Sequence, residues 1–255
     1  MKTCLSGGFF FSIHSAYLRG IINHKSIKMK NTLFLLLFVS FLTVNAQRMG
    51  FNVAEFSIHD SMEDEMIEAF DKSLEGVVFD GGGIVLERLW NGRESHVTHR
   101  IVWMFTLGKD MIKSGLNQDK QEAFWAKMQT FVKEWNTGYA GRMLSWQEGN
   151  TDENSFGHIY DIKVSDPAKF KTAHDKIVNQ HQDIFKDRVV GFGTYDMGRP
   201  NGATHWVALT GKDRMDHLMV QDELEKRSNF IKLLGERGPV EEVKDFEIQI
   251  LRRAQ

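Results

Sequence analysis

The chain has 255 residues, with 32 basic and 34 acidic side chains and a formal net charge of −2. This balance provides no excess of positive charge for nonspecific binding of nucleic acid. Its single cysteine, Cys4, excludes a disulfide framework and a multi-cysteine metal site within the chain.

Residues 29–46 have the three parts of a secretory signal peptide. The basic start Met29-Lys30-Asn31 is followed by a short apolar run and by the small-residue exit Val44-Asn45-Ala46 before Gln47. The apolar run is shorter than the ~20 residues of a membrane span. We therefore expect residues 1–28 to lie upstream of the true start and the mature protein to be exported, to the periplasm or beyond.

Loss of residues 1–46 would change the charge of the protein. This segment holds five basic residues, no acidic residue and the only cysteine, which leaves 27 basic against 34 acidic side chains and a formal charge of −7. An acidic mature chain is a poor partner for nucleic acid or for an anionic membrane surface. We expect neither partner, and no membrane span after cleavage.

The first half, residues 50–149, predicts two strand–helix units. A cap at Asp60 or Ser61 followed by acidic residues favours a helix start, and apolar residues then recur at helical spacing. Runs rich in apolar residues between turn signals predict the strands. The expected elements are a strand over 51–58, a helix from 61 to 74, strands over 84–90 and 99–107, a helix over 118–135 and a strand over 142–146.

The second half, residues 155–253, predicts the same order after a polar linker, Asn150 to Asn154. Pro167 after Asp166 is favourable at the first position of a helix. The expected elements are a strand over 156–164, a helix from 166 to 184, strands over 189–195 and 204–210, a mostly helical stretch over 213–234 and a strand over 246–251.

An internal repeat with an offset of 106 residues relates the two halves. Thr98-His99 and Gly108-Lys109-Asp110 recur as Thr204-His205 and Gly211-Lys212-Asp213. The same offset aligns the first strand of each half, so that Glu55 falls on Asp161. A repeat of this length is typical of a duplicated structural unit.

The order β-α-β-β-α-β in each half predicts an α+β fold of two tandem ferredoxin-like repeats. Helices would cover one face of each sheet, and the two other faces would meet to form a pseudo-dimeric α/β-barrel. In this respect the chain, from about Phe51 to Leu251, resembles the dimeric α/β-barrel superfamily in a tandem fused form. The resemblance implies relatives that include cofactor-free monooxygenases, haem enzymes related to chlorite dismutase, and stress-induced small proteins.

Strand alternation separates the candidate site residues. Glu55 and Asp161 should face the space between the sheets, where a partly desolvated carboxylate can become a general base; they could also face solvent. His99 and His205 could act as acid/base groups or ligate haem iron, or only mark a common strand entry. His174 and His181 share one helix face, which we interpret as an amphipathic border.

Strand aromatics could line an apolar ligand cavity or fill it; the candidates are Trp103, Tyr160, Tyr195 and Trp206. No metal-ligand spacing is persuasive, and haem is the one cofactor that the resemblance raises. Two functions stay open. The first is an exported protein that binds a small apolar or amphipathic ligand, or another chain, between the repeats; the second is a cofactor-free monooxygenase or haem-dependent enzyme. The sequence does not decide whether the protein is an enzyme or whether it assembles further.

Overall fold

A computed structural model describes residues 48–255 of the chain. The expected signal peptide and upstream segment lie outside the described residues. The first half contains β1 (Met49–Ile58), α2 (Glu63–Leu74), β2 (Val78–Phe79), β3 (Gly82–Leu89), β4 (His99–Thr106), β5 (Ile112–Ser114), α3 (Gln118–Gln129) and β6 (Val132–Gln147).

The second half contains more helix. Its elements are β7 (Phe156–Val164), α4 (Pro167–Gln180), α5 (Gln182–Phe185), β8 (Val190–Met197), the 3-10 turn η1 (Pro200–Gly202), β9 (His205–Gly211), α6 (Arg214–Glu225), α7 (Ser228–Glu236) and β10 (Val240–Ala254). Among residues 48–255, no helix is both long and apolar enough to cross a membrane.

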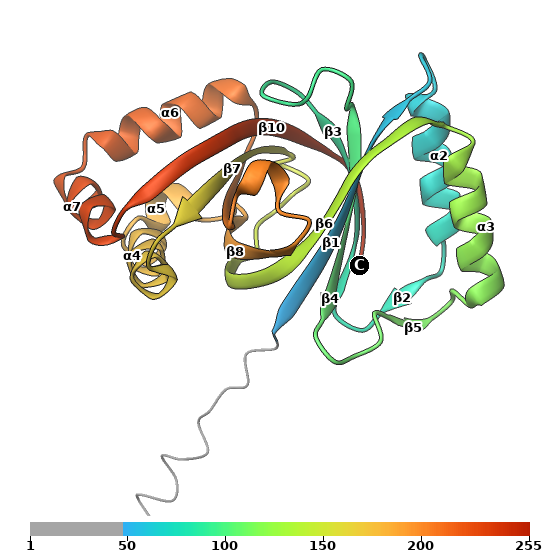
Figure 1. Ribbon diagram of the computed structural model, residues 1–255, viewed down its shortest axis with the longest axis horizontal. Coiled ribbons are helices and arrows are strands. Elements are labelled where there is room, and N and C mark those ends of the chain that lie inside the picture. The colour runs from blue at the N-terminus through green and yellow to red at the C-terminus, as the bar shows by residue number, and fades with distance from the viewer. Residues whose placement is uncertain (1–47) are drawn as a thin grey trace, which may run out of the picture. The chain divides into compact units, whose positions relative to one another are not determined.

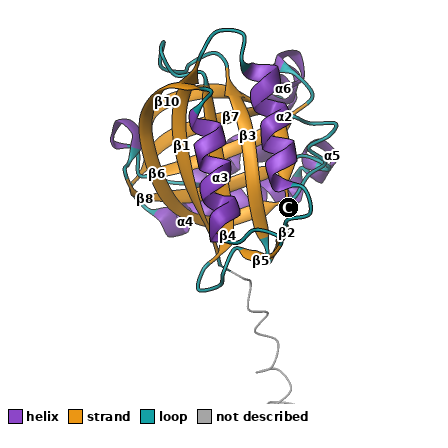
Figure 2. Cartoon of the chain, turned by 90° about the vertical axis from the view of Figure 1, so that its right-hand side faces the viewer, coloured by secondary structure: helices purple, strands orange, loops and turns teal. Residues whose placement is uncertain are grey.

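Eight antiparallel strands form one closed barrel in the order β1-β4-β3-β10-β7-β9-β8-β6. The short strands β2 and β5 pair separately. Helices α2 and α3 lie outside the barrel on one side, and α4 to α7 lie outside it on the other (Figure 1). Figure 2 shows the barrel strands behind α2 and α3. Within residues 48–255, every helix therefore lies outside the barrel interior.

The prediction of two tandem ferredoxin-like repeats with separate sheets is wrong. Strand β3 of the first half pairs with β10 of the second, and β6 pairs with β8, so all eight strands belong to one sheet. A sheet edge leaves backbone N–H and C=O groups unpaired, and closure removes such edges. The long strands β6 and β10, of 16 and 15 residues, provide these pairings.

The offset of 106 residues is preserved in strand register. Phe56 pairs with His99 in the first half, and Ile162 pairs with His205 in the second. In both halves a threonine hydroxyl lies 2.8 Å from the Nδ1 of the following histidine, at Thr98 and at Thr204. The same hydroxyls accept a backbone N–H from the neighbouring strand. The Thr-His pair is thus part of the strand pairing.

The predicted helix over 118–135 is too long. Asn117 caps α3 by accepting from the backbone N–H of Lys120 at 3.0 Å, but the helix ends at Gln129. Val132 already pairs with Ile58 of β1, and Trp135 belongs to β6. The apolar residues of this stretch fit a helical period, but strand pairing determines the structure from Val132 onward.

Alternation along the strands divides the core into inner and outer parts. One cluster lies inside the barrel and includes Phe51, Val53 and Trp206. A second lies between the barrel and α2 and α3. On the opposite side, beneath α4 to α7, the buried residues fall into two separate clusters. A pocket described below is lined by residues of both of these last two clusters.

Candidate functional site

The predicted acids Glu55 and Asp161 lie near each other at one end of the barrel interior. Both line the same polar cleft of about 340 Å³. The Tyr195 hydroxyl donates to Asp161 Oδ1 at 2.6 Å, and the Tyr139 hydroxyl donates to Glu55 Oε1 at 3.1 Å. Burial raises the pKa of the Asp161 carboxyl to about 6, although the hydrogen bond from Tyr195 opposes the rise.

A buried ion pair that the sequence analysis missed lies next to these acids. Arg100 Nε donates to Glu87 Oε2, and Arg100 Nη1 donates to the Tyr139 hydroxyl at 3.2 Å. Both charged side chains are less than a tenth exposed. Strand alternation could have predicted the inward position of Arg100. His99 points away from the barrel interior, and the next residue in a strand points to the opposite face.

The two predicted histidines point away from the barrel interior. His99 Nε2 lies 3.0 Å from Glu63 Oε2 of α2, and burial, followed by the charges of Arg88 and Arg93, lowers its pKa to about 4. His205 stacks on Phe192 with ring centroids 5.4 Å apart, and burial lowers its pKa. Neither histidine shares a cavity with Glu55 or Asp161, so the structure does not assemble these four residues into one site.

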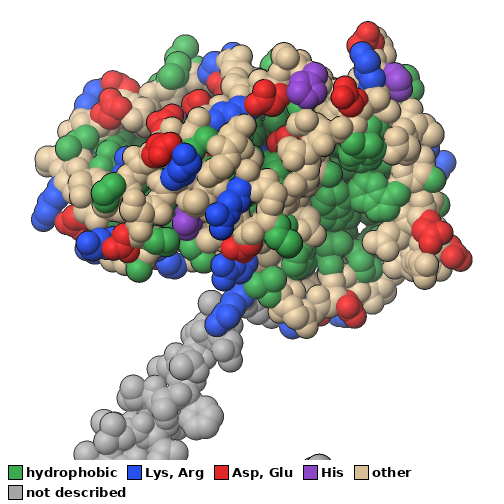
Figure 3. All heavy atoms as spheres, in the orientation of Figure 1, with side chains coloured by type: hydrophobic (Ala, Val, Ile, Leu, Met, Phe, Trp, Pro, Cys, Tyr) green, Lys and Arg blue, Asp and Glu red, His purple; other side chains and the backbone are tan. Residues whose placement is uncertain are grey.

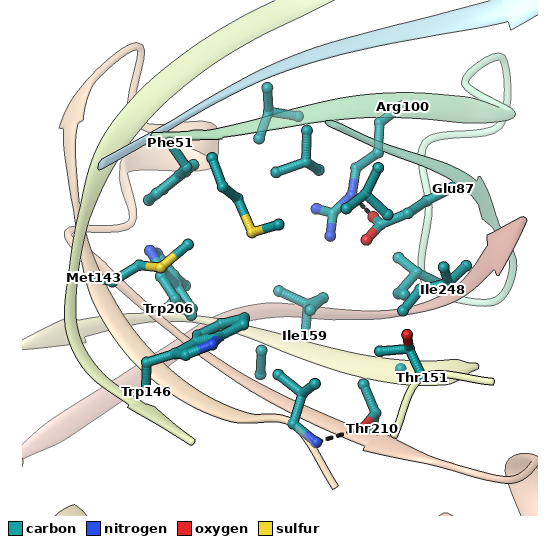
Figure 4. A pocket seen from close by; sticks show the side chains of 18 of the residues that line it. Phe51, Glu87, Arg100, Met143, Trp146, Thr151, Ile159, Trp206, Thr210 and Ile248 are labelled. Atoms are coloured by element: carbon teal, nitrogen blue, oxygen red, sulfur yellow. Dashed lines mark hydrogen bonds and ion pairs between the residues drawn. The ribbon is translucent and has the colours of Figure 1, made fainter. Parts of the chain in front are cut away.

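Two of the four candidate aromatics point into the barrel, and the other two point away from it. Tyr195 and Trp206 line an apolar cavity of about 110 Å³ inside the barrel (Figure 4). Trp103 faces outward and packs on Trp125 of α3, with centroids 5.1 Å apart. Figure 3 shows hydrophobic side chains gathered in a hollow beside α2 and α3. Tyr160 also faces outward, on the other side of the barrel.

The pocket that Tyr160 lines is larger than the barrel cavity. It lies between the outer face of β7 and β9 and the helices α4, α6 and α7, with a volume of about 510 Å³. Its walls are mainly apolar and include Phe170, Leu224 and Phe230. We call this space the helix–sheet pocket. A mainly apolar cavity with a few polar groups is the usual form of a small-molecule site.

His174 of α4 is the most unusual residue of the helix–sheet pocket. It is 8% exposed, and neither ring nitrogen forms a hydrogen bond with another described residue. Asp175 Oδ1 lies 3.6 Å from Nδ1, just beyond hydrogen-bonding distance. The ring instead lies near Phe170 and Phe192, with centroids 6.4 and 5.7 Å away. A buried polar group without a partner requires an explanation, and a ligand is one.

The corresponding helix of the first half, α2, has an apolar residue where α4 has His174. The buried residues of α2 are Met66, Ala69, Phe70 and Leu74, and those of α4 include Phe170, Ala173, His174 and Val178. In these two patterns His174 takes the place of Phe70. A phenylalanine has no polar atoms to satisfy, so the first half contains no corresponding unpaired group at this position.

Three polar side chains form a hydrogen-bonded chain along the wall of the helix–sheet pocket. The Tyr160 hydroxyl lies 3.0 Å from His158 Nδ1, and His158 Nε2 lies 2.7 Å from Asp245 Oδ2. Burial, followed by the charges of Asp245 and Glu242, raises the pKa of Tyr160 to about 12. The Asp245 carboxylate, half exposed, can only accept, so His158 Nε2 carries the ring proton. In the neutral ring Nδ1 is then the acceptor, and the Tyr160 hydroxyl donates to it.

The comparisons with known proteins support the fold. No protein family and no curated protein sequence matches the chain. Many solved structures are similar to the chain, and two of them illustrate the match. A candidate monooxygenase from Fusobacterium nucleatum subsp. nucleatum has 14% identity and a TM-score of 0.51, and the match covers 82% of this chain and 95% of that one. A candidate monooxygenase from Lactobacillus acidophilus NCFM, with 10% identity and a TM-score of 0.52, covers 81% and 98%.

These similarities concern the fold alone, because the identities are low. They show that this chain shares its overall fold with the two structures, which agrees with the resemblance at the level of the fold.

Proposed function

We propose that this protein is a monooxygenase-like enzyme that oxidises a small, mainly apolar aromatic substrate in the helix–sheet pocket. The observation that carries the proposal is the buried His174, whose two ring nitrogens lack partners among the described residues. An imidazole in its neutral form accepts a proton, and a water-poor pocket strengthens its interaction with a substrate hydroxyl. The two similar structures described as candidate monooxygenases favour this reaction class.

A two-ring quinol fits both the size and the chemistry of the pocket. His174 takes a proton from the quinol hydroxyl, and the electron-rich ring carbon beside it bonds to O₂. The proton then passes to the peroxide, and the O–O bond breaks with loss of water. The balance is quinol plus O₂ giving hydroxyquinone plus water. The quinol ring supplies all four electrons that reduce O₂, and the ring C–H at the oxidised carbon supplies the second proton of the water, so no bound cofactor is required.

The chain from Tyr160 to Asp245 has a separate part in this proposal. The Tyr160 oxygen accepts a hydrogen bond from the second substrate hydroxyl, while its own proton stays on the bond to His158. Because Asp245 is half exposed, the chain leads from the pocket to solvent. Tyr160 and His158 thus orient the substrate, and Asp245 holds the His158 ring in one tautomer.

Oxygen uptake with naphthohydroquinone tests the proposal, with the spontaneous reaction subtracted. The expected product is hydroxynaphthoquinone that carries one atom of ¹⁸O from ¹⁸O₂. His174→Phe should lower the rate about 10²- to 10⁴-fold, the usual contribution of general acid–base catalysis. Asp161→Asn with Glu55→Gln is the matched control and should keep the rate. An unchanged rate in His174→Phe would refute the proposal.

A second candidate function, haem binding, rests on the same residue. A histidine nitrogen is a common haem ligand, and the unpartnered His174 ring in a pocket of about 510 Å³ fits that requirement. His174 would ligate the iron, Phe170 would pack on the macrocycle, and haem would supply the oxygen chemistry. Haemin titration should then produce a Soret band that His174→Phe loses and that His99→Ala and His205→Ala keep. Without such a band, the cofactor-free reaction stands.

We also propose that the protein is exported. The support is the pattern of residues 29–46 in the sequence alone. Expression with this segment intact, followed by N-terminal sequencing of the mature protein, should place the first residue at Gln47. A mature protein that retains Met29 would contradict export by this signal.

A further inference from the structure

The cavity inside the barrel is a second site, separate from the helix–sheet pocket. Its volume of about 110 Å³ approaches that of engineered apolar cavities, about 150 Å³, which bind benzene or xenon. The cavity is lined by residues of both halves, and the barrel strands separate it from His174. Its ligand therefore need not be the substrate proposed above.

The two sides of the cavity differ although they come from equivalent positions. Arg100 and Glu87 form the buried ion pair on one side, and 106 residues later the same positions are Trp206 and Gly193. Figure 4 shows Arg100 and Glu87 across the cavity from Trp206, Trp146 and Met143. Equivalent positions of the two halves thus form a polar wall on one side of the cavity and an aromatic wall on the other.

Two inward-facing glycines of β8 make room for the aromatic wall. A Cβ on Gly193 would overlap the Trp206 indole, and a Cβ on Gly191 would lie 2.8 Å from the Trp146 ring and 2.9 Å from that of Trp206. Side chains at these positions would displace both indoles. The absence of side chains at Gly191 and Gly193 therefore lets both rings lie against the strand.

Unpaired donors in the cavity wall indicate which ligand fits. Trp206 Nε1 and Arg253 Nε are buried and form no hydrogen bond with any described residue. Arg100 uses Nε and Nη1 in its bonds to Glu87 and Tyr139. An indole N–H can only donate, and leaving it unpaired in an apolar space costs free energy. A ligand that supplied an acceptor oxygen would remove this cost.

Charge narrows the ligand class further. The guanidinium of Arg100 is already balanced by Glu87, so an ion in this cavity would be buried without a counter-charge. We infer that the barrel cavity binds a neutral, ring-sized apolar molecule with one acceptor oxygen, such as a cyclic ketone, and that Trp206 Nε1 donates to that oxygen.

A matched pair of ligands tests this inference. Cyclohexane and cyclohexanone have the same ring, and only the ketone has an acceptor. In NMR titrations of the ¹⁵N-labelled mature chain, cyclohexanone should bind about two- to tenfold more tightly, the contribution of one hydrogen bond. The indole N–H resonance of Trp206 should shift with the ketone and much less with the hydrocarbon.

Variants distinguish this site from the helix–sheet pocket. Trp206→Phe should remove the preference for the ketone, and Ala208→Leu, which fills the cavity, should abolish binding of both ligands. His174→Phe is the control and should leave both affinities unchanged. Xenon-pressurised crystals of the unmodified chain should show density in the barrel even if Ala208→Leu does not fold. Equal affinities for the two ligands, an unmoved Trp206 resonance or an empty barrel under xenon would overturn the inference.

Discussion

Replacement of His174 by phenylalanine should stabilise the protein while it removes the proposed activity. His174 is 8% exposed, with both ring nitrogens unpartnered among the described residues. An unsatisfied buried polar group costs about 1–3 kcal/mol. Phe70 occupies the equivalent place on α2, and the adjoining pocket of about 510 Å³ leaves room for the larger ring. We therefore expect the free energy of unfolding to rise by about 1–2 kcal/mol.

The same α4 helix has a matched control at its C-terminal end. His181 is fully buried, but its Nδ1 lies 2.8 Å from the Ile177 carbonyl oxygen and its Nε2 lies 3.3 Å from Asn229 Oδ1. His181→Phe breaks both contacts and should destabilise the protein by about 1–3 kcal/mol. Urea unfolding followed by circular dichroism measures both variants. If His174→Phe destabilised the protein as much as His181→Phe, the reasoning about the unpaired nitrogens would be wrong.

Three further predictions concern the barrel interior. Arg100→Met should lower the free energy of unfolding in urea by about 3–5 kcal/mol, because it leaves Glu87 buried and unpaired. Adding Glu87→Leu should recover most of this loss, and equal losses in the single and double variants would contradict the prediction. The pKa of Asp161 rises from an unfolded value of 3.8 to about 6, so its protonated form favours folding and this stability is lost as pH rises from about 4 to 6. Asp161→Asn should reduce that decline in unfolding free energy by up to about 3 kcal/mol, measured at pH 4 and pH 7, and an identical decline in both proteins would argue against the shift. Gly193→Ala should lower stability by about 1–3 kcal/mol because its Cβ would overlap Trp206 and the Arg142 carbonyl oxygen; unchanged thermal unfolding would show that the strand yields without cost.

Several local features followed from the sequence because their causes are local. The period of two along a strand placed Glu55 and Asp161 on the barrel side, where both line one cleft. Asp166 and Pro167 predicted the start of α4, and Asp166 caps the helix by accepting from the Lys169 N–H at 3.0 Å. The repeat at 106 residues reappears in the strand registers of both halves.

The tertiary structure decided what depends on contacts between distant segments. The pairings β3–β10 and β6–β8 close the barrel, and no local pattern states which edges meet. Helical spacing marked His174 and His181 as sharing one face, but only packing shows that His181 has two partners and that His174 has none. Sequence periodicity reports the direction of a side chain, whereas satisfaction of its polar atoms depends on neighbours brought together by the whole fold.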